Sequence, residues 1–87
     1  MARFFRAQNA QGRMLEILGL MNDYNEKWQM LGRGAGDELR DNLRERLANV
    51  YEARLQALLR GENPYGVKRE EYEETMAIFR RFSGVAA

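Results

Sequence analysis

The chain contains no cysteine and no histidine, and only one serine and one threonine. Without cysteine, it can form neither a disulfide nor a thiolate zinc site. Without histidine, it lacks the most common general base and the most common metal ligand of proteins. A Ser/His/Asp triad cannot be assembled either. These absences predict that the chain is not an enzyme and that it holds no cofactor or metal.

The chain also lacks a strong charge of one sign and a long apolar run. Lys and Arg together number 14 and Asp and Glu 13, so the net charge is +1. That balance does not predict a strongly basic nucleic-acid binder. The sequence contains no apolar run of transmembrane length, and its N-terminus lacks the apolar core of a secretory signal. We therefore expect no membrane span and a cytoplasmic location.

Apolar residues recur at helical spacing in the first third of the chain. They alternate three and four residues apart, at Met14, Ile17, Met21, Tyr24, Trp28 and Leu31. This heptad spacing predicts a helix over about residues 3–31. Gly19 lowers the helix propensity in its middle, which suggests that another helix approaches closely there. Gly32 is expected to end the helix in a left-handed conformation.

Two glycine-containing turns separate two further helices. The three glycines of residues 32–36 predict the first turn, and leucines at helical spacing predict a helix over about residues 37–60. Gly61 is a typical helix stop, and the only proline lies in the second predicted turn, residues 61–67. A helix over residues 68–83 follows, because early glutamates and late arginines suit the helix dipole.

The sequence therefore predicts an all-α, bundle-like fold in one domain over residues 1–87. We expect a long antiparallel helical hairpin with a shorter third helix at the C-terminal end. A chain of 87 residues is near the size at which one hydrophobic core barely suffices. It also carries more apolar helix face than one hairpin can hide, so we expect a homo-oligomer or a partner protein.

Two clusters resemble functional motifs without matching them. The glycines at 32, 34 and 36 do not have the spacing of a dinucleotide loop, and no Lys with a hydroxyl residue follows as in a P-loop. The glutamates at 70, 71, 73 and 74 lack the histidines of carboxylate-bridged metal sites. We interpret the first cluster as a linker and the second as a solvated helix start.

Arginine and phenylalanine alternate near both ends of the chain, in Arg3-Phe4-Phe5-Arg6 and Phe79-Arg80-Arg81-Phe82. Such pairs suit contacts with phosphates and bases, with proteins or with a membrane surface. Phe79 and Phe82 share a helical stripe with Tyr72 and Met76, so we expect them in the core or at an interface. Adjacent phenylalanines at 4 and 5 point about 100° apart, so one can pack inward while the other contacts a partner.

The sequence predicts a non-enzymatic, helical protein-binding module of the adaptor, assembly-factor, chaperone or inhibitor type. It would act through an apolar and aromatic helix face, whose residues are core or interface residues. The alternative is a small nucleic-acid-binding regulator that uses the arginine- and phenylalanine-rich termini. The predicted partner-binding residues are Phe4, Phe5, Met14, Ile17, Met21, Tyr24 and Trp28, with the arginines Arg3, Arg6, Arg80 and Arg81.

Overall fold

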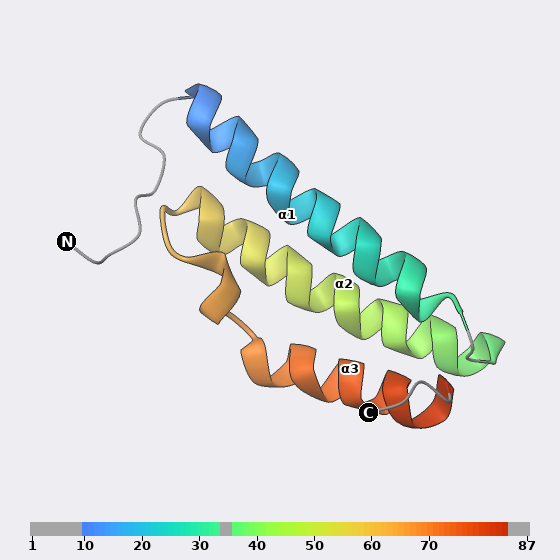
Figure 1. Ribbon diagram of the computed structural model, residues 1–87. Coiled ribbons are helices and arrows are strands. Elements are labelled where there is room, and N and C mark those ends of the chain that lie inside the picture. The colour runs from blue at the N-terminus through green and yellow to red at the C-terminus, as the bar shows by residue number, and fades with distance from the viewer. Residues whose placement is uncertain (1–9, 34–35, 84–87) are drawn as a thin grey trace.

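The computed structural model describes residues 10–33 and 36–83. Helix α1 spans Ala10–Leu31, α2 spans Asp37–Leu59 and α3 spans Arg69–Ser83, and a 3₁₀ turn, η1, spans Pro64–Gly66. Figure 1 shows α1 and α2 as an antiparallel hairpin, with the shorter α3 on the other side of α2. The predicted all-α fold is thereby confirmed. Residues 3–9 of the first predicted helix lie outside the described residues.

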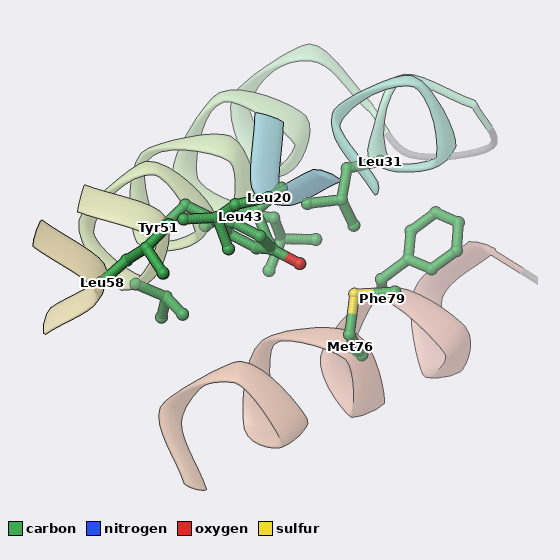
Figure 2. Packing of buried hydrophobic residues seen from close by; sticks show 9 residues of the cluster. Leu20, Leu31, Leu43, Tyr51, Leu58, Met76 and Phe79 are labelled. Carbon is green, nitrogen blue, oxygen red and sulfur yellow. The ribbon is translucent and has the colours of Figure 1, made fainter. Parts of the chain in front are cut away.

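The core is built around α2, the central helix. Its side chains at Leu43, Leu47, Val50 and Leu58 are buried, because they recur three, four or eight residues apart and so share one face. Leucines 20 and 31 of α1 and Met76 and Phe79 of α3 complete the cluster. Figure 2 shows these side chains converging from all three helices. The buried face of α2 thus packs against both neighbouring helices.

An arginine from α2 caps the end of α1. The backbone N–H of Gly32 bonds to the carbonyl of Gln29, which leaves the Trp28 carbonyl free to accept from Arg44. Arg44 donates from Nε at 3.2 Å and from Nη2 at 3.1 Å, and its guanidinium lies 4.6 Å from the centre of the Trp28 ring. The last carbonyls of α1 are therefore satisfied partly by a side chain from the next helix.

The expectation that Gly32 is left-handed was wrong. Among the described residues, positive φ occurs at Gly61 and Lys68 and not at Gly32. A Cβ at position 32 would instead lie 3.2 Å from Arg44 Cζ and collide with the adjoining guanidinium nitrogen. A side chain at position 32 would therefore require the Arg44 guanidinium to move. Gly61, with φ 84°, ends α2 in a Schellman motif, since Glu62 N–H bonds to the Ala57 carbonyl.

A second arginine of α2 joins this helix to α3. Arg54 is 4% exposed, and its Nε donates to the Val67 carbonyl at 3.1 Å, in the segment between η1 and α3. Its guanidinium also lies 4.8 to 5.5 Å from the ring centres of Tyr51, Tyr65 and Tyr72. Three aromatic faces and one carbonyl thus surround the charge, which compensates for part of its loss of hydration.

We expect Arg54→Ala to lower the free energy of unfolding by about 2–4 kcal/mol, because it removes a buried charged hydrogen bond and the stacking on three rings. Arg54→Lys should give an intermediate loss, since an ammonium cannot stack as a planar guanidinium does. Urea denaturation followed by circular dichroism measures both. Arg46→Ala is the control, because exposed Arg46 makes only a 3.8 Å ion pair with Glu74. A loss no larger than that of the control would contradict this role.

Candidate functional site

The exposed face of α1 carries very little charge. Ten residues of α1 with described side chains are exposed, and of these ten only Arg13 and Glu26 are charged. Ten residues of α2 are also exposed, and six are charged: Asp37, Glu38, Asp41, Glu45, Arg46 and Glu52. Solvated helix faces are normally rich in charge, as on α2. The exposed face of α1 therefore has the composition of an interaction surface.

Four large apolar side chains are the main feature of this face. Met14, Leu15, Leu18 and Met21 are between 52% and 64% exposed. Each of them lies three or four residues from another member of the group, so together they cover one side of the helix. Toward the C-terminal end, the same face continues with the uncharged amides Asn22, Asn25 and Gln29, all exposed. We call Met14, Leu15, Leu18, Met21, Asn22 and Asn25 the α1 outer face.

Gly19 lies at the edge of the α1 outer face and is exposed. A Cβ built at this position would have no heavy atom of the described chain within 4 Å. Glycine inside a helix costs about 1 kcal/mol relative to alanine. The close helix approach that the sequence suggests at Gly19 is therefore not made by α2 or α3.

An apolar groove of about 220 Å³ adjoins the α1 outer face between α1 and α2. Leu20, Met21 and Tyr24 line it from α1, and Ala48, Tyr51, Glu52 and Leu55 line it from α2. Leu59 is exposed and lies one turn after Leu55, so it extends the α2 side of this surface. The uncovered apolar surface thus spans both helices of the hairpin.

A hydrogen bond between helices keeps the groove apolar. The Tyr51 hydroxyl donates to the Asp23 carboxylate of α1, so its polar atom is satisfied while its ring faces the groove. Burial raises the pKa of Tyr51, the bond to Asp23 raises it further, and nearby Arg54 opposes the change. Burial also raises the pKa of Tyr24, against the effect of Arg44. Both rings therefore stay neutral at ordinary pH.

The structure divides the predicted α1 stripe between two faces. Met14 and Met21 are exposed, whereas Ile17, Tyr24 and Trp28 are partly buried against the core. The Tyr24 ring centre lies 5.6 Å from that of Trp28 and 5.1 Å from that of Tyr51. The two methionines thus lie with Leu15 and Leu18, which were not among the predicted binding residues. The signal for these two leucines was their position beside the heptad stripe, where they widen the apolar face of the helix.

The C-terminal arginine–phenylalanine cluster is also divided. Phe79 is 3% exposed and lies in the core. Phe82 is 57% exposed, so it is not in the core of the described chain, and its place at an interface stays a prediction. Arg80 and Arg81 are exposed, and the Arg81 guanidinium lies 5.1 Å from the centre of the Phe82 ring. The other predicted residues, Arg3, Phe4, Phe5 and Arg6, lie outside the described residues.

A second groove, between α1 and α3, is chemically mixed. Met30, Met76 and Phe79 form its apolar part, and Lys27, Glu73 and Arg80 place both signs of charge along it. In residues 10–33 and 36–83, no three acidic side chains come together as metal ligands. Nor is any helix in this part of the chain long and apolar enough to cross a membrane. The α1 outer face is therefore the most distinctive described surface.

The burial of Tyr51, together with its bond to Asp23, makes the protein less stable at alkaline pH. Because the pKa of folded Tyr51 is above that of unfolded tyrosine, its contribution is complete below about pH 10 and is lost as the pH rises further. We expect Tyr51→Phe to lower the free energy of unfolding at pH 8 by about 1 kcal/mol. Above pH 10 the free energy of unfolding of the wild type should fall, relative to that of the variant, by up to about 1.4 kcal/mol for each pH unit. Urea denaturation of both proteins at pH 8 and at pH 11 measures the difference in their free energies of unfolding. The same difference at both pH values would contradict the prediction.

Comparison with protein-family models, with curated proteins and with solved structures finds no significant match to this chain.

Proposed function

We propose that the protein is a non-enzymatic, protein-binding module that acts through the α1 outer face. The observation that supports this most is the exposure of four large apolar side chains on a helix face that is almost free of charge. Contiguous exposed apolar surface is unfavourable in water, and a protein partner removes it from water. An adaptor, an assembly factor, a chaperone and an inhibitor would all use this mode of binding.

Binding would follow the helix-face mode, in which one amphipathic helix lays its apolar side chains against another. Met14, Leu18 and Met21 provide flexible and branched apolar contacts, and methionine adapts to partners of different shape. The adjoining groove between α1 and α2 offers room for a partner side chain. Asn22, Asn25 and Glu26 lie beside the apolar centre, where polar contacts give specificity.

We expect Leu18→Glu to abolish partner capture, because it places a charge in the centre of the apolar face. Asn49→Glu is the matched control, since it adds the same charge to the exposed face of α2. Tagged full-length variants are compared in a lysate of the source organism by affinity capture and quantitative mass spectrometry. Proteins held by the wild type should fall at least tenfold with Leu18→Glu and persist with the control.

Equal capture by both variants would contradict a role for the α1 outer face. Retention on DNA or heparin that falls steeply with salt would favour the nucleic-acid alternative. Arg80 and Arg81 are exposed, but they share α3 with exposed Glu70, Glu73 and Glu74. These acids on the same helix weaken its attraction for phosphate, which is why we favour a protein partner.

A further inference from the structure

We propose that the occupant of the α1 outer face is a second copy of this chain, with the two α1 helices packed antiparallel about a two-fold axis near Leu18. This inference rests on the proposed function, because it names the partner of the same surface. It specifies the centre and the direction of the interface, which the proposed function leaves open.

The order of side chains along α1 suits a two-fold interface. Such an interface places the same patch of each copy against the other. A residue that lies before the axis in one copy is therefore level with the residue that lies equally far after the axis in the other copy. With the axis at Leu18, Leu15 of one copy lies level with Met21 of the other, three residues away on either side. Met14 lies level with Asn22, where the face changes from apolar to amide side chains. The apolar part is thus centred on Leu18.

Charge favours this partner over the other described surfaces of the chain. A charged side chain brought against the apolar centre would lose its water without gaining a counter-ion. The exposed faces of α2 and α3 carry many glutamates and aspartates, whereas the α1 outer face carries no charge. Among the faces of the described residues, the α1 outer face is therefore the best complement to itself.

The helix dipoles favour the antiparallel direction. Parallel helices side by side align their dipoles, which is repulsive, whereas antiparallel helices oppose them.

A single cysteine tests the two-fold axis directly, because the chain has no cysteine of its own. A disulfide requires two Cβ atoms about 4 Å apart, which Leu18→Cys meets when position 18 lies on the axis. We expect this variant to oxidise to a covalent dimer, and Glu45→Cys, on the exposed face of α2, to remain largely uncrosslinked at the same concentration. Equal crosslinking of both variants, or none, would overturn the proposed axis.

Light scattering after size exclusion tests the association without a covalent bond. The wild type and Asn49→Glu should show twice the chain mass of 10.2 kDa, and Leu18→Glu should show a single chain at the same concentration. Far-ultraviolet circular dichroism checks that Leu18→Glu stays folded, and Leu15→Glu is a second variant of the same face. A single-chain mass for the wild type at every concentration would overturn self-pairing. Loss of captured proteins with Leu18→Glu would then still support the proposed function, so the two ideas fail separately.

Discussion

The burial of one apolar stripe of α2 between two other helices is the constraint on which the rest of the structure depends. Leu43, Leu47 and Val50 are fully buried because α1 and α3 cover α2 from different sides. A three-helix chain in which α2 takes the centre leaves α1 and α3 at the edges (Figure 1). Each edge helix is therefore covered by α2 on one side only. The residues on its other side determine what the helix can bind.

Two arginines of α2 determine where its neighbours end and begin. Arg44 donates to a carbonyl in the last turn of α1, and Arg54 donates to the carbonyl of Val67 just before α3. Both guanidinium groups also lie over aromatic rings and bond to backbone oxygen. A planar group with several donors can serve a carbonyl and a ring face together, which lysine cannot do. The central helix thus positions its neighbours by polar contacts as well as by apolar burial.

The two edge helices use their outward sides differently. The exposed side of α3 is acidic at its start and basic at its end, as the helix dipole favours. The exposed side of α1 is apolar in its first half and amide-bearing in its second, with few charges. A charged side is stabilised by water, whereas an apolar side is stabilised by removal from it. This contrast places the proposed interaction surface on α1.

Local patterns in the sequence predicted the helices well, because helix formation depends on residues three and four positions apart. Phe79 is buried and Gly61 ends α2 as these patterns indicate. They did not predict which of Phe79 and Phe82 is exposed, or that Gly32 lies against the Arg44 side chain. In both cases the outcome depends on a neighbour distant in sequence: Phe82 has no helix over it among those described, and Gly32 lies against Arg44.

The sequence by itself determined that this chain is all-α and that it carries more apolar helix face than one hairpin can hide. Only the tertiary structure decided which apolar residues of α1 face the core. Ile17, Tyr24 and Trp28 pack against the core, and Met14, Leu15 and Leu18 face away from it. The physical reason is that periodicity measures the width of an apolar face, whereas the number and position of packed helices determine how much of it is covered.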